Sequence, residues 1–346
     1  MRACIVGISG VIPKERLAIE SLNRIYGENT VKRIMKATGI DEIRIAPNEL
    51  TAADYAEEAA RRLMDKVEVS FSNVDALVFV SQSPDYIVPH TSAVLQAKLG
   101  IPTSAIAIDL NFGCAGYVYG LFQSMMYIAT GYAKNVLLLV SDTMSRRVHP
   151  KDKSLRLVIG DGGTATFLTA KDDSLDSKFT FFTDGNGAKY LTIPAGGARV
   201  PLKPGKTDVL LGDDDGNFRT AENIYMDGRA IMDFALEKVP SVIYETLDKM
   251  GWEKDDVDLF AIHQANAFMV KYLAKLMKIP ICKAPVAVKF LGNTSAASIP
   301  LMLSSLYAGN SASLKKVVVC GFGTGLACAA GTVNLSQTHI MPIIEI

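Results

Sequence analysis

The sequence has no excess of charge, because its 36 lysine and arginine residues are balanced by 36 aspartate and glutamate residues. Nucleic acids and anionic membranes generally attract proteins with a basic excess, so neither is predicted as a partner. No apolar run approaches the roughly 20 residues of a membrane-spanning helix, which predicts no membrane insertion. The apolar start from Ala3 to Ile12 is interrupted by Ser9-Gly10 and stops at Pro13, so it indicates a strand rather than a signal peptide.

Patterns that hold disulfides, metals or nucleotides are also missing. The five cysteines form no C-x-x-C pair, and the chain has only four histidines. We therefore predict no disulfide framework, no metal site and a reducing cytoplasmic location. No G-x-x-x-x-G-K-[ST] segment occurs, and Gly321–Gly325 lacks the strand-and-helix context of a dinucleotide site. We expect no cofactor.

What is present is an alternation of strand-like apolar runs and helical patterns, which predicts an α/β fold with parallel or mixed sheets. Strands are predicted at Ala3–Ile8, Ala76–Ser81, Ala105–Leu110, Val136–Ser141, Thr164–Leu168, Val257–Ile262, Pro285–Lys289, Val317–Gly321 and Ala327–Val333. Helices are predicted at Ala52–Lys66, Thr91–Leu99, Cys114–Thr130, Ile231–Met250 and Phe268–Met277. Ala195–Asn217, rich in Gly, Pro and Asp, is predicted to be an irregular surface excursion.

The two halves of the chain resemble each other. Leu99-Gly100-Ile101-Pro102 is echoed 178 residues later, and Gly113-Cys114 lies opposite Gly292-Asn293 at an offset of 179. We therefore predict a duplicated βα unit, residues 1–172 and 173–346, related by a pseudo-twofold axis. Ligands in open α/β sheets bind at the carboxyl ends of strands, so a pocket is expected where equivalent strand ends meet.

Cys114 is the first candidate for chemistry. It lies in the turn Asn111–Tyr117 between a predicted strand and a predicted helix. The positive end of a helix dipole favours a thiolate, which is the nucleophilic form of cysteine. The alternative is an inert buried cysteine, since free cysteine is among the most buried residue types.

Three further segments carry candidate groups. His263 ends a buried strand and precedes the polar Gln264 and Asn266, although a hydrogen-bonded core histidine would look the same. Asn293 is either a helix N-cap or an amide donor for a developing oxyanion. The turn Gly321–Gly325 is either a bend or a means of bringing a backbone N–H to a thioester carbonyl. A cysteine, an imidazole and a carboxamide suit a hydrolase, or acyl transfer followed by carbon–carbon bond formation.

The chain resembles the β-ketoacyl-ACP synthase III family. The similar segments are Thr38-Gly39-Ile40, Gly113-Cys114-Ala115-Gly116, Gly160-Asp161-Gly162, Ile262-His263-Gln264-Ala265-Asn266, Gly292–Pro300 and Gly321-Phe322-Gly323-Thr324-Gly325. They occur in order over essentially the whole chain. The resemblance implies a thiolase fold of stacked α-β-α-β-α layers, a homodimer, and decarboxylative Claisen condensation.

The resemblance also implies roles for individual residues. Cys114 takes an acyl group from a CoA or acyl-carrier-protein thioester, through an oxyanion held by the N–H groups of Cys114 and Thr324. His263 and Asn293 donate hydrogen bonds to a malonyl thioester as CO₂ leaves, and the enolate attacks the acyl group to give a β-ketoacyl thioester. Further substrate contacts are predicted for Phe322, Gly323, Gln264, Asn266 and Arg33.

Some positions depart from the family pattern. Relatives that prime from acyl-CoA carry a Trp and an Arg that hold the adenine, whereas the equivalent positions here are Arg33 and Ala37. The arginine used in carrier-protein docking is Phe268 here. We therefore expect a specialised branch rather than the housekeeping initiator, and Gln82–Tyr86 also resembles such branches.

The carrier protein has a predicted docking face on the second half of the chain. The lysines at 271, 275 and 278 fall roughly on one face of a predicted helix, which would suit an acidic carrier or would simply be solvated. Two other functions remain open: acyl transfer to an alcohol or amine without condensation, and a subunit of a heterodimeric ketosynthase.

Overall fold

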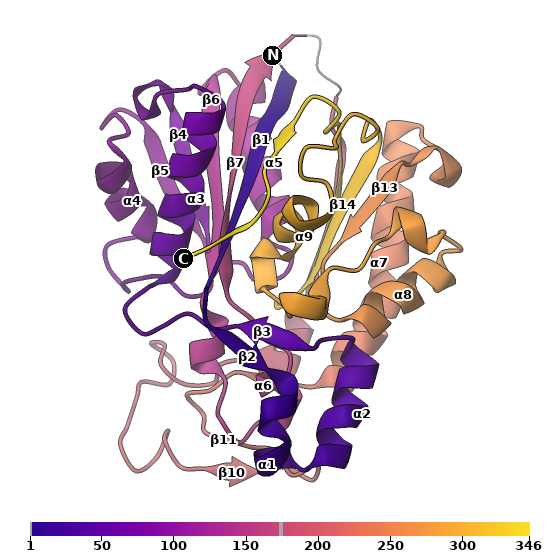
Figure 1. Ribbon diagram of the computed structural model, residues 1–346. Helices are drawn as coiled ribbons and strands as arrows, with labels where there is room; N and C mark the ends of the chain where they lie inside the picture. Colours follow the sequence, from indigo (N-terminus) through magenta and orange to yellow (C-terminus); the bar gives the residue numbers. More distant parts are fainter. Residues whose placement is uncertain (1, 173–175) are drawn as a thin grey trace.

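The computed structural model describes residues 2–172 and 176–346. Two β-sheets and three layers of helices alternate across the molecule (Figure 1). The first sheet has the order β16-β1-β7-β6-β4-β5, with β17 paired to β1, and the second has the order β13-β14-β15-β8. Their strands are β1 (Arg2–Ile12), β4 (Ala76–Val80), β5 (Ile106–Leu110), β6 (Asn135–Asp142), β7 (Gly162–Lys171), β16 (His339–Ile340), β17 (Ile344–Glu345), β8 (Phe179–Thr183), β13 (Leu259–Ile262), β14 (Val317–Gly323) and β15 (Ala327–Val333).

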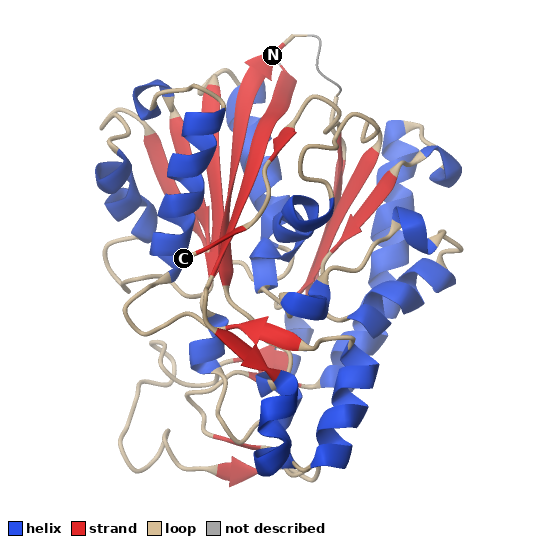
Figure 2. Cartoon of the chain, viewed as in Figure 1, coloured by secondary structure: helices blue, strands red, loops and turns tan. Residues whose placement is uncertain are grey.

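Helices fill the space outside and between the sheets (Figure 2). α3 (Ala52–Lys66) and α4 (Thr91–Leu99) cover the outer face of the first sheet, and α7 (Gly228–Met250) and α8 (Ala267–Leu276) cover that of the second. α5 (Gly116–Ala129) and α9 (Ser298–Leu306) lie between the sheets. The predicted α-β-α-β-α stack is therefore confirmed.

The apolar strand runs arise because both faces of each sheet are covered. In β6, Leu138 and Val140 belong to the core between the sheets, while Leu137 and Leu139 belong to the core under α3. Successive strand residues point to opposite faces, so a strand buried on both sides needs an unbroken apolar run. For this reason the strands could be predicted from unbroken apolar runs in the sequence.

The duplication is visible in the pairing of the strands. In the first sheet β4 and β6 are parallel, whereas β6–β7 and β7–β1 are antiparallel. In the second, β13 and β14 are parallel, whereas β14–β15 and β15–β8 are antiparallel. The predicted pair of βα halves has this matching pattern. Their predicted boundary adjoins residues 173–175, which lie outside the described residues, and it stays a prediction.

Two predicted elements differ from the structure. Pro285–Lys289 is not a strand, because Pro285 has no N–H and the Ala287 N–H donates to the Gln264 side chain at 2.8 Å. The helix predicted from Cys114 begins only at Gly116, whose N–H bonds to Gly113 O at 2.6 Å in a tight turn.

Strands β4, β5, β6, β13 and β14 end at one end of the molecule, where smaller elements cover them (Figure 1). These elements are β2 (Arg16–Ala18), β3 (Glu42–Arg44), α1 (Asn23–Tyr26), α2 (Glu28–Thr38), α6 (Lys153–Arg156), β9 (Leu191–Thr192), β10 (Leu211–Gly212), β11 (Phe218–Arg219) and β12 (Tyr225–Met226). Short 3₁₀ turns are η1 (Ile19–Leu22), η2 (Phe71–Asn73), η3 (Met144–Arg147), η4 (Gly185–Tyr190), η5 (Lys254–Asp256), η6 (Ile281–Lys283), η7 (Val288–Phe290) and η8 (Ser295–Ala297).

Buried polar side chains fasten this covering region to the sheets. The Asp161 carboxylate, just before β7, accepts hydrogen bonds from the Ala46 N–H at 2.8 Å and the Ser145 N–H at 3.0 Å. Arg44 is buried and pairs with Glu345 near the C-terminus at 3.0 Å. Buried charges are stable only when they are paired in this way. Within the described chain, no helix is both long and apolar enough to cross a membrane.

Candidate active site

A cavity lies where the strand ends of the two halves meet. Its polar floor contains Cys114, His263 and Asn293, the three predicted catalytic residues, together with Gln82, Ser295 and Thr324. Its other walls are mainly apolar: Met144, Leu155, Ile159, Leu191, Ile224, Met226, Ile231 and Phe322. A dry wall around a few convergent polar groups is the usual form of a small-molecule site.

Cys114 is held by a close approach between two turns. A side chain at Gly323 would place its Cβ 2.8 Å from Cys114 Cβ and 3.1 Å from Sγ. At Gly321 a Cβ would lie 2.6 Å from Cys114 O. Only glycine permits such contacts. Gly321 and Gly323 lie at the end of β14, and Thr324 directly follows that strand. The predicted N–H donors of Cys114 and Thr324 therefore belong to two segments that touch.

The Cys114 sulfur is protonated at neutral pH. Burial and, to a smaller extent, the nearby Asp142 carboxylate raise the pKa of the Cys114 thiol to about 12, against the lowering effects of its own N–H and of the Ser295 hydroxyl. The predicted bias of the helix start toward a thiolate is present as the lowering effect of the Cys114 N–H, but burial outweighs it, because Cys114 lies before the first residue of α5. The thiol must lose its proton during the reaction.

His263 is a neutral hydrogen-bond donor. Burial lowers its pKa to about 3. Its Nδ1 lies 2.6 Å from Ser298 Oγ, which also accepts the Gln264 N–H at 3.3 Å. Because the Ser298 hydroxyl has no other acceptor among the described residues, we assign its proton to Nδ1, and the ring proton to Nε2. The edge-on ring of Phe322, 5.4 Å between centroids, fixes the imidazole from the side.

Asn293 presents its amide nitrogen as a second neutral donor. Its Oδ1 accepts the Ser295 N–H at 3.0 Å, which leaves the NH₂ group for the cavity. Backbone bonds to Val158 O at 2.8 Å and from the Gly160 N–H at 3.0 Å hold its main chain. Gly292 adopts φ +67, and a Cβ there would lie 2.7 Å from Val158 O. Glycine is thus required immediately before the asparagine.

The other predicted contacts fall into two groups. Phe322 and Gly323 line the cavity. The side-chain amide of Gln264 instead bonds to main-chain groups, donating to Ile262 O at 2.8 Å and accepting the Ala287 N–H at 2.8 Å. Asn266 caps α8 by accepting the Met269 N–H at 2.8 Å, and Arg33 is exposed on α2. The last three residues are not among those that line the cavity.

Sequence reasoning missed four polar residues that surround the catalytic groups. Ser295 and Ser298 lie within a motif that was read for its asparagine alone. Gln82 donates to Thr324 Oγ1 at 3.3 Å, and Asp142 accepts the Gln82 N–H at 2.7 Å. The signal for Asp142 was available, since it is an acidic residue that directly follows a predicted strand of the same sheet.

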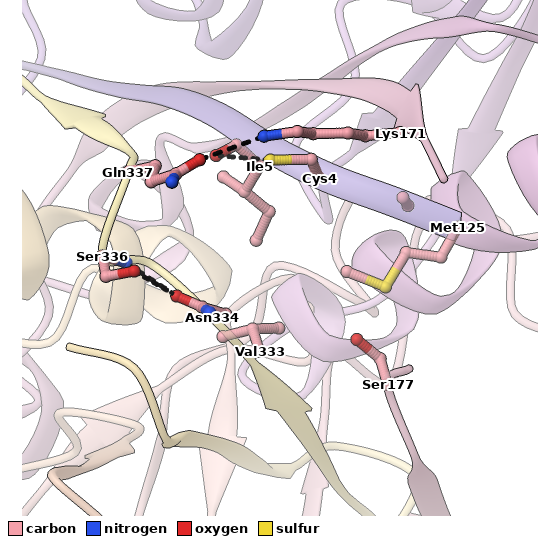
Figure 3. Close-up of a pocket in the computed structure, with 10 residues that line it drawn as sticks. Cys4, Ile5, Met125, Lys171, Ser177, Val333, Asn334, Ser336 and Gln337 are labelled. Atoms are coloured by element: carbon pink, nitrogen blue, oxygen red, sulfur yellow. Dashed lines mark hydrogen bonds between the residues drawn. The ribbon is translucent and has the colours of Figure 1, made fainter. Parts of the chain in front are cut away.

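A second cavity lies far from these groups, at the opposite end of β7 (Figure 3). It is lined by Cys4, Met125, Lys171 and Gln337, among others, and Lys171 Nζ donates to Gln337 Oε1 at 3.1 Å. β7 pairs with Asp142 at its start and reaches Lys171 at its end, a strand length of about 30 Å. The predicted catalytic residues line the first cavity and not the second.

Comparison with known proteins agrees with this geometry. Residues 108–189 match the family 3-Oxoacyl-[acyl-carrier-protein (ACP)] synthase III, and residues 247–335 match its C-terminal family. The β-ketoacyl-[acyl-carrier-protein] synthase III of Clostridium perfringens is 31% identical, with 96% of this chain and 99% of that protein covered. The chain belongs to the β-ketoacyl-ACP synthase III family. The family and its ketoacyl synthase class, predicted from the sequence, are confirmed.

Solved structures of this family share the fold. A 3-oxoacyl-(acyl-carrier-protein) synthase III crystal structure has a TM-score of 0.93 and 41% identity, covering 96% of this chain and all of that one. The 3-oxoacyl-(acyl-carrier protein) synthase of Burkholderia xenovorans LB400 has a TM-score of 0.92 and 35% identity, covering 100% of this chain and 97% of that one. The predicted thiolase-type fold of the synthase III family is confirmed. Membership of a specialised branch stays a prediction.

We predict that His263 stays neutral and carries its proton on Nε2 from pH 5 to pH 8, because burial keeps its pKa near 3. ¹⁵N NMR of histidine-labelled enzyme measures both the charge and the tautomer. In Ser298→Ala the Nδ1 partner is lost, so the tautomer preference should weaken while the ring stays neutral. A titration of His263 near its ordinary pKa of roughly 6.5 would contradict the assignment.

Proposed function

We propose that this enzyme joins an acyl group carried on Cys114 to a malonyl thioester, with loss of CO₂, to give a β-ketoacyl thioester. The observation that supports it most is the pairing of one thiol with two neutral donors, His263 and Asn293, in one cavity. In the first step the sulfur attacks the acyl thioester carbonyl. The oxyanion formed there is held by the N–H groups of Cys114 and Thr324, and the donor thiol leaves.

The malonyl step needs an electron sink. When the bond to the carboxylate breaks, its electron pair moves to the thioester oxygen as an enolate. Neutral donors fixed in a cavity stabilise such a charge by about 3 kcal/mol each, and His263 Nε2 and the Asn293 NH₂ are donors of this kind. The enolate carbon then attacks the acyl carbonyl on Cys114, and the sulfur departs as a thiolate that takes up a proton from solvent to restore the thiol. The chain's own groups carry each step without a cofactor.

Simple acyl transfer to an alcohol or amine fits less well. That reaction needs a base that lines the cavity and contacts the acceptor, and a base works best with a pKa near the operating pH; Asp142 does not line the cavity. His263, with a pKa of about 3, is a weak base and has a serine rather than a carboxylate at Nδ1. The intact set of Cys114, His263 and Asn293 likewise argues against a catalytically inactive subunit of a heterodimer.

We predict that Asn293→Ala separates the two half-reactions. The variant should still become acylated on Cys114, but condensation should fall by about two to three orders of magnitude because one enolate donor is lost. Intact-protein mass spectrometry measures acylation, and release of labelled CO₂ from malonyl thioester measures the second step. Equal loss of both half-reactions would contradict the division of labour.

We also propose that at least one substrate arrives on an acyl carrier protein. The names of the similar proteins describe acyl-carrier-protein synthases. α8 begins two residues after Ala265, which lines the cavity, and it presents exposed Lys271 and Lys275 beside exposed Phe268 and Tyr272. Acidic partners are guided by such basic residues. On α2, Arg33 and Ala37 are both exposed and offer no aromatic ring for the CoA adenine.

We predict that kcat/KM is higher for an acyl group on the carrier than for the same group on CoA. Loss of an aromatic stacking partner costs ~1–3 kcal/mol, or roughly ten- to a hundredfold in affinity. Lys271→Ala combined with Lys275→Ala should lower the carrier reaction and its salt dependence, whereas Lys134→Ala, at the far end of β6, should change neither. A preference for CoA that persists in the lysine variants and in Arg33→Ala would overturn this proposal.

We further propose a cytoplasmic homodimer. β5 is the last strand of its sheet and is paired only to β4, so its apolar edge is available to a second copy. The nearby loop exposes Tyr86, Ile87 and Val88, with Ile87 95% exposed. Large exposed apolar groups of this kind mark interaction sites. All five cysteines are free, which suits a reducing compartment.

We predict a species of twice the chain mass in sedimentation at micromolar concentration. Ile87→Asp should shift it toward the monomer because a charge would be buried at the interface. Ile25→Asp is the matched control, since Ile25 is also exposed, at 63%, but lies on α1. A stable monomer of the unaltered chain, or equal effects of the two substitutions, would contradict the assignment.

A further inference from the structure

Acylation of Cys114 needs a proton acceptor, which neither His263 nor Asn293 provides. The thiol is protonated at neutral pH, so its proton must move to another group as the sulfur attacks. His263 is a poor acceptor, because its Nδ1 already has a hydroxyl partner and its Nε2 is assigned a proton. Asn293 offers the cavity only donors. The acceptor must therefore lie elsewhere in the site.

Asp142 is a buried carboxylate with unused acceptor capacity. It ends β6 and is fully buried. Its Oδ1 accepts the Gln82 N–H at 2.7 Å and the hydroxyls of Ser81 and Ser83, both at 3.2 Å. Its Oδ2 has no hydrogen-bond partner among the described residues. Buried carboxylate oxygens are rarely left without a partner, so an unpaired one beside a nucleophile indicates a function.

Ser295 lies beside both the carboxylate and the sulfur. Its hydroxyl lies near enough to both groups to lower the pKa of Asp142 and the pKa of Cys114. Its backbone adopts φ 52, a conformation uncommon for a residue other than glycine, and its N–H is fixed by Asn293 Oδ1 at 3.0 Å. Ser295 lines the cavity together with Cys114, and its turn η8 packs against β6, the strand that ends at Asp142.

We propose that Asp142 accepts the Cys114 proton through the Ser295 hydroxyl during acylation. As the sulfur forms its bond to the acyl carbonyl, the thiol proton passes to Ser295 Oγ and the serine proton passes to Asp142. When the bond to the donor sulfur breaks, the departing thiolate takes the proton back along the same path. Asp142 ends as a carboxylate and the donor ends as a neutral thiol, so charge and protons balance.

The surroundings of Asp142 set the pH at which the relay works. The groups facing it are Ser81, Gln82 and Ser83 at the end of β4, Ser295 on η8, and the Cys114 thiol, of which only the thiol titrates. Burial raises the pKa of Asp142 to about 6. The carboxylate is thus present at neutral pH and is lost as the pH falls through about 6. Acylation should decline over that range, while the malonyl step should not.

The test compares two serine variants in the two half-reactions. It rests on the proposed function, since it measures acylation of Cys114 by rapid quench and mass spectrometry, and malonyl decarboxylation separately. Ser295→Ala should slow acylation by about a hundredfold and remove the decline near pH 6, with a smaller effect on decarboxylation. Ser298→Ala, the matched variant, should impair decarboxylation more than acylation. Asp142→Asn should match Ser295→Ala in rate and pH profile.

Three results would contradict the relay, the proposed function or both. Unchanged acylation and an unchanged pH profile in folded Ser295→Ala would overturn the relay alone. Equal effects of Ser295→Ala and Ser298→Ala on both half-reactions would reduce both serines to structural roles and overturn it as well. No acylation of the unaltered enzyme by any acyl thioester would overturn the proposed function, and the relay with it.

Discussion

The close contact between the turn of Cys114 and the turn of Gly323 is the constraint on which the site depends. The turn of Cys114 belongs to the first half of the chain and Gly323, at the end of β14, to the second; a Cβ at position 323 would lie 2.8 Å from Cys114 Cβ, so only glycine permits the approach. Both segments lie at strand ends, and α5 and α9 pack together in the core between the two sheets. The cavity is lined by residues from both halves of the chain. A single half would supply either the nucleophile or the enolate donors, but not both.

Burial then determines how the groups in this cavity behave. It raises the pKa of the Cys114 thiol and of Asp142 and lowers that of His263, so at neutral pH the cysteine and the histidine are both uncharged. Uncharged, fixed donors suit a reaction whose charge develops only in the transition state. The same burial disfavours ionisation of the Cys114 thiol. The proposed relay through Ser295 to Asp142 therefore supplies an acceptor for the thiol proton. The two serines beside the catalytic residues divide between the two half-reactions.

Much of this arrangement was predictable from the sequence because the strands are buried on both faces. Runs such as Val136–Ser141 and Ala327–Val333 are apolar throughout, and their order indicated the layers. The failures have local causes. Pro285–Lys289 forms no strand, because Pro285 has no N–H and the Ala287 N–H donates to the Gln264 side chain. The tight turn Gly113–Gly116 places the start of α5 at Gly116 rather than at Cys114. Gln264 looked like a substrate contact, but only coordinates show that its amide is used by the backbone. The pKa of Cys114 likewise depends on burial, which a helix-start pattern does not reveal.

The central claim is that Cys114 carries the acyl group. The most direct measurement is peptide mapping by mass spectrometry after incubation with a panel of acyl thioesters on CoA and on carrier protein. The account predicts one acyl increment per chain, on the peptide containing Cys114, and none in Cys114→Ala. An increment on another of the five cysteines, or labelling that survives Cys114→Ala unchanged, would contradict it.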